Sequence, residues 1–464
     1  MKKLILPLMI LAVSADCVQA CGAAGAEAHL QRTMPQAWPD TAAAAELPSA
    51  DGWWRGFGDP LLDSLISEAE DNNFNLVVAL RRMDAARRQI DAARSAYYPQ
   101  IGVSAGYERA RSQGVSASTY SLGASLSWEI DLFGKITAAV RRDKAQYRAS
   151  RADWVGSMQS LCGQVAEAYI GLRVSQSELA VARAHIIRQD TISQLAATRF
   201  ECGLASKIDV DQQLTVLYST EAAVPQYEVA VRSYINSLAL LLGVYPEEIA
   251  ARLAGPAPLP NYNAPVAAGV PAGLLRRRPD ILAAEQQIEA AAASLGIARK
   301  DYLPSLSLQG AVGVSAPRPG DMFTDRGFTY SVAPTLSWTL FDGFARRAGV
   351  ASARDALESA VATYNFTVMN AYTEVADALD SYRTSLEQAE YYRKAAEAAA
   401  ELLDMSLDLY TQGLEEFTVV ANAQVDLLNY TNSVITSRGA AMTALVSLYK
   451  ALGGGYSEYL NTDE

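Results

Sequence analysis

The side chains that carry most enzyme chemistry are scarce in this chain of 464 residues. His29 and His185 are its only histidines, and no glycine-rich phosphate loop follows a predicted strand. No spacing of His, Cys, Asp or Glu resembles a metal site, and the nine methionines form no cluster of the kind that binds copper or silver. Carboxylates alone select no catalytic pair. We therefore expect no enzyme activity, no metal and no cofactor.

One cysteine has a clear chemical expectation. The residues Val18-Gln-Ala-Cys21 resemble a lipobox, in which the cysteine becomes the lipid-modified first residue of the mature chain. Ordinary cleavage after Ala20 is the alternative, because Val-Gln-Ala also resembles a small-residue cleavage site. A lysine pair and an apolar run over residues 4–13 precede it, as in a secretory signal. We expect a signal peptide over residues 1–20, lipid on Cys21 and export of the protein.

Composition restricts the partners of the exported chain. The formal net charge is −12, so nucleic acid is excluded as an expected partner. Half of the residues are hydrophobic, but after the leader no uninterrupted apolar stretch reaches the ~18 residues of a transmembrane helix. Any membrane contact must therefore come from another kind of element.

The sequence contains one unit twice. A shift of 210 residues places Leu126-Ser-Trp128 on Leu336-Ser-Trp338 and Gly203-Leu204 on Gly413-Leu414. One offset holds for well over a hundred residues, which chance rarely produces. The fold should therefore be internally duplicated.

Each copy contains a very long helical segment. The segments, roughly 135–200 and 344–411, lack proline and carry apolar and small residues at helical spacing. At ~1.5 Å per residue, such a helix is on the order of 100 Å long. A glycine suited to a left-handed cap ends each segment, and a second helix returns to Gly243 or Gly453. We predict two long antiparallel helical hairpins, with a kink or local unwinding at Pro225 in the first returning helix.

Before each long helix the hydrophobic period changes from 3.6 to 2. Two β-hairpins are predicted, over about 100–129 and 305–338, with apolar residues alternating with small or polar ones. Strands of about ten residues with this alternation are typical of an outer-membrane β-barrel. Aromatic residues gather where the strands approach the helices, as in a membrane girdle: Tyr97, Tyr98, Trp128, Tyr302, Trp338 and Phe341. A soluble sandwich with one solvated face is the alternative.

Four strands cannot close a barrel on their own. An open sheet edge in lipid would leave backbone groups unpaired, so the barrel must be shared between chains. A dimer would give eight strands and a trimer twelve, and only the trimer would leave a lumen. We predict an α+β membrane protein whose three copies form a 12-helix α-barrel and a shared 12-stranded transmembrane β-barrel.

The order of motifs along the chain resembles the TolC/OprM family of outer-membrane efflux factors, in its lipoprotein branch. The resemblance rests on Trp53-Trp54, Tyr98-Pro99, Leu126-Ser-Trp-Glu-Ile-Asp-Leu-Phe-Gly134, Arg199-Phe-Glu-Cys-Gly203-Leu-Ala-Ser-Lys-Ile-Asp209, Leu274-Leu-Arg-Arg-Arg278-Pro279-Asp280-Ile and Tyr449-Lys-Ala-Leu-Gly-Gly454. It covers nearly the whole mature chain.

The resemblance implies a passive exit duct in the bacterial outer membrane that extends into the periplasm. Such a duct conducts small molecules received from a periplasmic adaptor and an inner-membrane pump of the RND type. A type I protein-secretion channel is the alternative within the same fold, and a non-porous periplasmic coiled-coil scaffold is the alternative outside it. A lone protein in the soluble periplasm would favour the scaffold.

In this family the hairpin tips also contact the adaptor, and the pore closes there. The resemblance assigns adaptor docking to residues at both tips: Arg199, Gly203, Leu204, Gly413 and Leu414. A simple helix cap is the alternative role for the glycines.

The gate departs from the family pattern. Relatives usually carry aspartates just after the second tip, where this chain has Asn422. Three carboxylates in a ring would repel, whereas Asn422 could close by amide hydrogen bonds. Glu415 and Glu416 would supply a displaced acidic ring, unless they are solvated tip charges. We expect closure to depend less on pH and divalent cations than in relatives with an acidic gate.

A basic run precedes a predicted helix. Arg277 and Arg278 stand before Pro279, which suits a first helical position, and Asp280 follows. A solvated charge cluster explains the run, and a structural salt bridge is the alternative. We treat these four residues as a structural motif.

The sequence predicts five successive segments after the signal peptide. They are a lipidated extended leader (21–58), a first repeat (59–243), a proline-rich equatorial crossover (244–275), a second repeat (276–453) that begins with a helix over 279–300, and a C-terminal tail (454–464).

Overall fold

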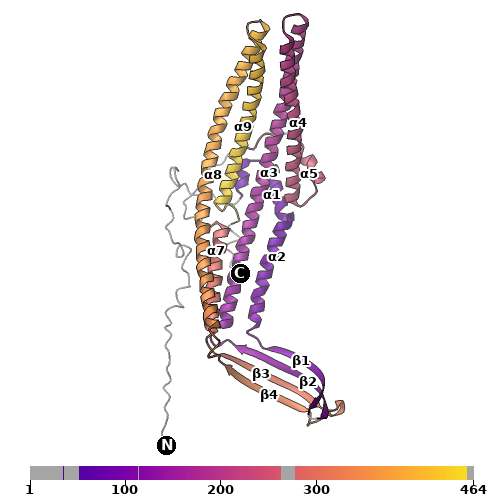
Figure 1. Cartoon of the computed structure of the whole chain (residues 1–464), viewed down its shortest axis with the longest axis vertical. Helices are drawn as coiled ribbons and strands as arrows, with labels where there is room; N and C mark the ends of the chain where they lie inside the picture. The colour runs from indigo at the N-terminus through magenta and orange to yellow at the C-terminus, as the bar shows by residue number, and fades with distance from the viewer. Residues whose placement is uncertain (1–34, 36–51, 113, 256, 263–276, 457–464) are drawn as a thin grey trace. The chain divides into compact units, whose positions relative to one another are not determined.

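The computed structural model describes residues 35, 52–112, 114–255, 257–262 and 277–456, and its elements are labelled in Figure 1. This range does not include the predicted signal peptide, Cys21, most of the leader, much of the crossover or the last eight residues. In chain order the elements are η3 (Trp53–Phe57), α1 (Pro60–Asn72), α2 (Phe74–Ser95), β1 (Gln100–Ser112), β2 (Val115–Ile130), α3 (Lys135–Glu201), α4 (Lys207–Leu242), α5 (Pro246–Leu253), α7 (Pro279–Lys300), β3 (Ser305–Ala316), η5 (Pro319–Asp321), β4 (Phe328–Ser337), α8 (Ala345–Thr411) and α9 (Phe417–Ala451). The predicted α+β composition is confirmed.

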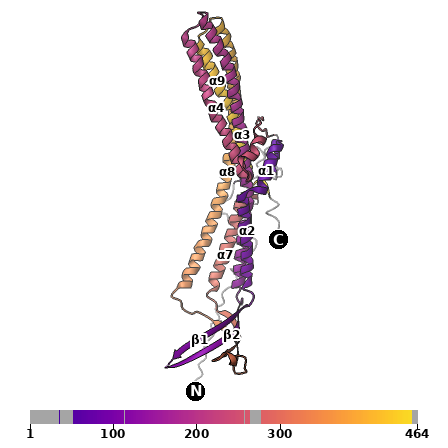
Figure 2. The same cartoon turned by 90° about the vertical axis from the view of Figure 1, so that its right-hand side faces the viewer.

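The two long helices, α3 and α8, have 67 residues each. In both views α4 runs back beside α3 and α9 beside α8, as two helical hairpins (Figures 1 and 2). Gly203 and Gly413, with φ of +73° and +75°, make the turns, because a residue without Cβ adopts the left-handed conformation at little cost. None of the helices in the described ranges has an apolar stretch sufficient to cross a bilayer.

The four strands form one antiparallel sheet in the order β1-β2-β3-β4. Its register aligns one row of apolar residues across all strands: Val103, Ala124, Val312 and Tyr330. The next row lies on the opposite face and is small or polar: Ser104, Gly123, Gly313 and Thr329. The predicted alternation is therefore confirmed, with an apolar face and a polar face. Within the described chain, β1 and β4 pair on one side only.

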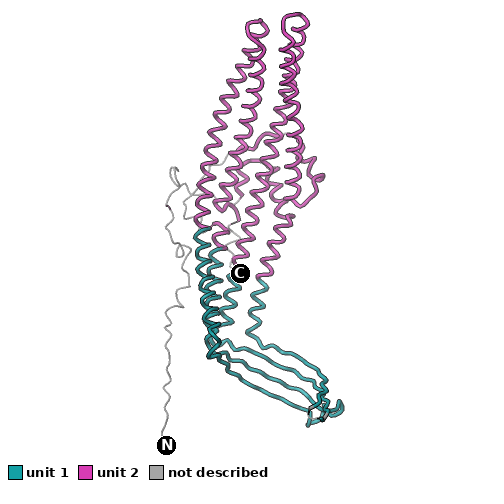
Figure 3. The backbone as a smooth tube through the Cα atoms, in the orientation of Figure 1, with its two compact units in different colours: residues 1–33, 87–147, 284–366 teal, residues 34–86, 148–283, 367–464 magenta. Residues whose placement is uncertain are grey.

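Packing divides the chain into two compact units, each with parts of both repeats (Figure 3). The described part of unit 1 comprises residues 87–147 and 284–366, which hold the sheet and the adjoining helix ends. Unit 2 holds the helical tips and a core in which leucines of α1, α4 and α5 are fully buried: Leu62, Leu65, Leu238, Leu242 and Leu253.

Two features differ from the sequence-based expectation. The crossover contains a helix, α5, which begins at Pro246 and carries Glu247 and Glu248 in its first turn. A proline at the first position and acidic residues in the first turn are signals for the start of a helix. They were not recognised in the sequence because the crossover contains so many prolines. The predicted local unwinding at Pro225 is wrong, because α4 continues through it. Glu221, whose carbonyl loses its helical donor, is exposed, so water can replace that hydrogen bond.

Candidate functional site

Both hairpin tips end in the same backbone motif. The N–H of Leu204 donates to the carbonyl of Arg199 at 2.8 Å, and the N–H of Leu414 donates to that of Leu409 at 2.9 Å. These are the six-to-one bonds of a Schellman cap. The motif turns Leu204 and Leu414 outward, where 66% and 69% of their surface is exposed. The tips therefore each present one leucine to solvent.

Arg199 has a different role from its neighbours. Its guanidinium donates to the carbonyl of Thr411 at 2.7 Å and lies 4.9 Å from the ring centroid of Tyr410. The Tyr410 hydroxyl in turn donates to Asp209 at 3.3 Å. Burial and the Asp209 carboxylate raise the pKa of Tyr410. Arg199 thus connects the two hairpin tips within one chain.

The predicted gate residues lie at the start of α9. Asn422, Glu415 and Glu416 are all exposed in the single chain. Glu416 is the N-cap residue of α9 but its side chain makes no capping hydrogen bond. The opposite face of α9 is buried, and there Gln424 donates to Gln213 at 2.9 Å. The exposed side is therefore available to other copies of the chain.

Of the arginine run, Arg278 is buried, with 8% of its surface exposed. Its guanidinium donates to Asp280 at 3.0 and 2.6 Å, to Glu374 at 2.7 Å and to the carbonyl of Ala451 at 2.9 Å. Burial opposes the charge, but both carboxylates outweigh it and raise the pKa of Arg278. For Arg278 the solvated-cluster interpretation is wrong, because the residue joins α7 to α8 and α9 in a salt bridge.

The other residues of this motif, Arg277, Pro279 and Asp280, lie at the start of α7. Arg277 is half-buried, and Pro279 is buried at the first position of α7. Asp280, the second residue of α7, also accepts a hydrogen bond from the N–H of Ile281 at 2.9 Å, one of the first-turn N–H groups that have no partner within the helix. The motif therefore combines a helix start with an ion pair.

The apolar face of the sheet is exposed in the single chain. Val103 and Tyr330 each have 77% of their surface exposed, and Val332 has 71%. At the strand ends near the helices, the indole N–H of Trp128 donates to the carbonyl of Tyr97 at 3.0 Å. Trp338 repeats this bond to Tyr302 at 2.9 Å. The same hydrogen bond thus occurs once in each repeat.

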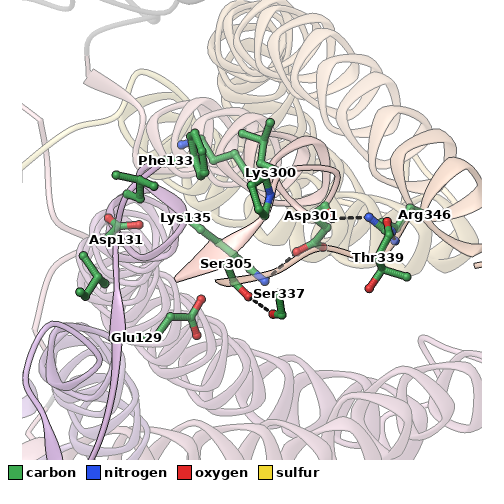
Figure 4. A pocket seen from close by; sticks show the side chains of 14 residues that line it. Glu129, Asp131, Phe133, Lys135, Lys300, Asp301, Ser305, Ser337, Thr339 and Arg346 are labelled. Atoms are coloured by element: carbon green, nitrogen blue, oxygen red, sulfur yellow. Dashed lines mark hydrogen bonds and ion pairs between the residues drawn. The ribbon is translucent and has the colours of Figure 1, made fainter. Parts of the chain in front are cut away.

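A cavity of about 140 Å³ lies in unit 1 where strands meet helices. Figure 4 shows ion pairs and hydrogen bonds among the residues that line it. Lys135 pairs with Asp301 at 2.6 Å, and Arg346 donates to the Asp301 carbonyl at 3.0 Å. Arg346 also pairs with Asp342 at 2.7 Å. These contacts connect the strand–helix junctions of the two repeats.

Several partners were missed because they lie far away in sequence. Glu374 and Ala451 contact Arg278 from 96 and 173 residues away. Tyr410 and Asp209 are 201 residues apart. The Ser206-x-x-Asp209 capping box was a readable signal at the first tip, whereas nothing in the sequence pointed to Glu374. Among the described residues, no group of three or more His, Cys, Asp or Glu could hold a metal ion.

Comparison with known proteins gives consistent matches. The family model described as "Outer membrane efflux protein" matches residues 65–244 and 270–454. The probable efflux pump outer membrane protein TtgC of Pseudomonas putida is 30% identical over 467 residues, covering 97% of this chain and 96% of TtgC. Outer membrane protein OprJ of Pseudomonas aeruginosa is 29% identical, covering 95% and 94%. The solved outer-membrane channel OprN superposes with a TM-score of 0.83 at 30% identity, covering 92% of this chain and all of OprN.

Proposed function

Since the chain belongs to the outer membrane efflux protein family and is an outer-membrane exit duct of an efflux system, we propose that three copies assemble around one axis to form it. Each copy contributes four strands to a twelve-stranded barrel and two helical hairpins to a twelve-helix tube. The duct has no catalytic step of its own, and solutes pass through it passively.

The proposal rests on the exposed apolar face and the open edges of the sheet. Its apolar face is exposed in the single chain, and within the described residues β1 and β4 each have a strand partner on one side only. Lipid covers apolar side chains, but it cannot satisfy backbone N–H and C=O groups. Pairing β1 of one copy with β4 of the next satisfies both edges at once.

The cargo and partners follow from the same assembly. TtgC of one Pseudomonas putida strain is described as a probable efflux pump protein. Two further relatives of this chain in that species, ArpC and the TtgC of another strain, are described as antibiotic and toluene efflux pump proteins. We infer small toxic solutes as cargo here, handed over by a periplasmic adaptor and an inner-membrane RND-type pump. The exposed Leu204 and Leu414 at the tips, flanked by Gly203 and Gly413, are the proposed docking contacts. Lipid on Cys21 would anchor the leader.

The proposed gate lies just after the second tip. Asn422 faces away from the buried side of α9, so three copies would bring three amides together. Glu415 and Glu416 are exposed nearby and would remain solvated. Because amides carry no charge, we expect conductance of the purified channel to be insensitive to millimolar divalent cations. Block by those cations would contradict an amide gate.

The assembly is tested in cells that lack the protein. Deletion should raise susceptibility to small toxic compounds, and the wild-type gene should restore resistance. Heat-resistant trimers should appear in the outer-membrane fraction. A monomer in the soluble periplasm would overturn the proposal.

A further inference from the structure

The polar face of the sheet carries charge at only two positions. Among the residues of β1–β4 that the register places on this face, Glu108 and Glu129 are the only charged ones. Glu108 lies opposite Thr119, and Glu129 lies ten residues further along β2. At ~3.3 Å per residue, the two carboxylates are about 33 Å apart, near opposite ends of the face.

Neither carboxylate is paired within the described part of the chain. Glu108 and Glu129 are exposed, and neither has a hydrogen bond or ion pair with any residue in the described ranges. The nearest basic residues in sequence, Arg109 and Arg111, are at alternate positions of β1, and Arg109 is in register with the apolar rows. Their charge is therefore directed to the other side of the sheet.

The described flanking segments form no ion pair with these carboxylates either. In the β3–β4 connection two arginines are accompanied by two aspartates: Arg318, Arg326, Asp321 and Asp325. At the cavity, Lys135 is paired with Asp301 and Arg346 with Asp342. Lys300 donates to the carbonyl of Gly134 at 2.7 Å. Asp131 and Glu129 line the same cavity. Asp131 accepts hydrogen bonds from Ile136 and Thr137, whereas Glu129 forms no ion pair with any residue in the described ranges.

We propose that Glu108 and Glu129 make the β-lined part of the duct selective for cationic over anionic solutes. The inference rests on the proposed trimer, in which the polar face lines the lumen and each glutamate occurs three times around the axis. A ring of like charges in a confined water-filled passage raises the local concentration of the opposite charge. The small side chains between the rings leave the passage open to hydrated solutes.

The test measures local potential through reaction rates of an introduced thiol. Ser125 is exposed on the polar face, opposite Gly102 and Ala311 and between the two glutamates. Ser125→Cys is placed in a Cys202→Ser background, because Cys202 is exposed whereas Cys162 is buried. Purified trimers are treated with a cationic and an anionic methanethiosulfonate reagent of similar size. The same background without Ser125→Cys gives the rate of non-specific labelling.

The cationic reagent should react faster, and Glu108→Gln with Glu129→Gln should lower the cation-to-anion rate ratio. A change of about one kT in potential alters that ratio about sevenfold, because the reagents carry opposite unit charges. Glu108→Lys with Glu129→Lys should invert the preference. Arg109→Gln is the matched control and should leave the ratio unchanged, since Arg109 is in register with the other face.

Equal rates before and after the glutamate substitutions would overturn the inference. They would leave the proposed duct intact, provided that the same trimers restore resistance in cells. A Ser125→Cys thiol that neither reagent reaches would overturn both, because the polar face would then not line water.

Discussion

The buried charge of Arg278 makes a prediction at the level of one residue. Arg278→Gln removes four hydrogen bonds, three of them to carboxylates. Charge-assisted bonds contribute about 1.5–3 kcal/mol each, but Asp280 and Glu374 are nearly half exposed and can be rehydrated. We expect a loss of about 2–4 kcal/mol in unfolding free energy, measured by denaturant titration.

Two variants make this measurement specific. Arg278→Lys keeps the charge but cannot span both carboxylates and the Ala451 carbonyl, so it should recover only part of the loss. Arg277→Gln is the neighbouring control, at a half-buried position, and should change stability little. Equal losses for Arg277→Gln and Arg278→Gln would contradict a role for the ion pair.

Residue types were readable from the sequence, but their partners were not. The run before Pro279 marked a helix start correctly, because that signal is local. Which arginine is buried depends on Glu374 and Ala451, which only the fold brings near. Arg199 was likewise predicted as a contact for another protein, and its contact with Tyr410 became visible only in the structure.

At the level of the helix, two glycines should respond in opposite directions. Gly413 ends α8 with φ of +75°, and an added Cβ would meet no atom within 4 Å. Gly413→Ala should therefore cost about 1–2 kcal/mol from backbone strain alone. Gly349 lies inside α8 in equally open space without a positive φ, so Gly349→Ala should stabilise by about 0.5–1 kcal/mol. Thermal unfolding of both variants checks the opposite signs, and a shared sign would contradict them.

The cap of α3 gives a pH-dependent prediction. The Asp131 carboxylate accepts from the N–H groups of Ile136 and Thr137, each at 2.9 Å. Partial burial opposes ionisation, but hydrogen bonds from Thr137, Ile136 and Lys135 outweigh it and hold the pKa of Asp131 below its usual value. A lowered pKa means that the cap stabilises above the unfolded pKa, about 4, and is lost as pH falls below it.

Asp131→Asn tests this cap. At pH 7 the variant should be about 1 kcal/mol less stable than wild type, because an amide has one acceptor oxygen where Asp131 uses two and it lacks the charge that favours a helix start. The difference should shrink as the pH is lowered from 5 to 3, because wild type then loses its charge too. A difference in melting temperature that is the same at pH 7 and pH 3 would contradict the assignment.

Elements were predicted best where one period continues over many residues. The long helices and the alternating strands satisfied this condition, and their positions follow from hydrophobic spacing alone. The short helix α5 did not, because eight residues within a proline-rich segment give too little periodicity. The local unwinding suggested by Pro225 does not occur, since the exposed surface around it tolerates a missing hydrogen bond.

At the level of the whole molecule, the two faces of β4 should tolerate charge differently. Val332 lies on the exposed apolar face, and its neighbour Ser331 lies on the polar face. Val332→Arg should impair assembly, because arginine on a lipid-facing surface costs up to about 2–4 kcal/mol. Ser331→Arg should assemble normally, since its side chain would reach water. The amount of heat-resistant trimer in outer-membrane fractions compares the two, and equal amounts would contradict the lipid-facing assignment.

The sequence indicated assembly because one chain has too few strands to close a barrel. Four strands with one apolar face cannot close by themselves, and the structure retains two unpaired edges in the described chain. The number of copies does not follow from one chain in the same way, because eight or twelve strands satisfy the edges equally. The preference for twelve comes from the need for a lumen.

The two indole hydrogen bonds, from Trp128 to Tyr97 and from Trp338 to Tyr302, fix a reference position for the strand register in each hairpin. A shift of one residue in the register of either hairpin would break the indole hydrogen bond. It would also move the apolar side chains of the shifted strand to the polar face of the sheet. A register error would therefore have two costs, the lost hydrogen bond and the exchange of apolar and polar side chains between the two faces. Correct alignment at the rim therefore sets the alignment of everything beyond it.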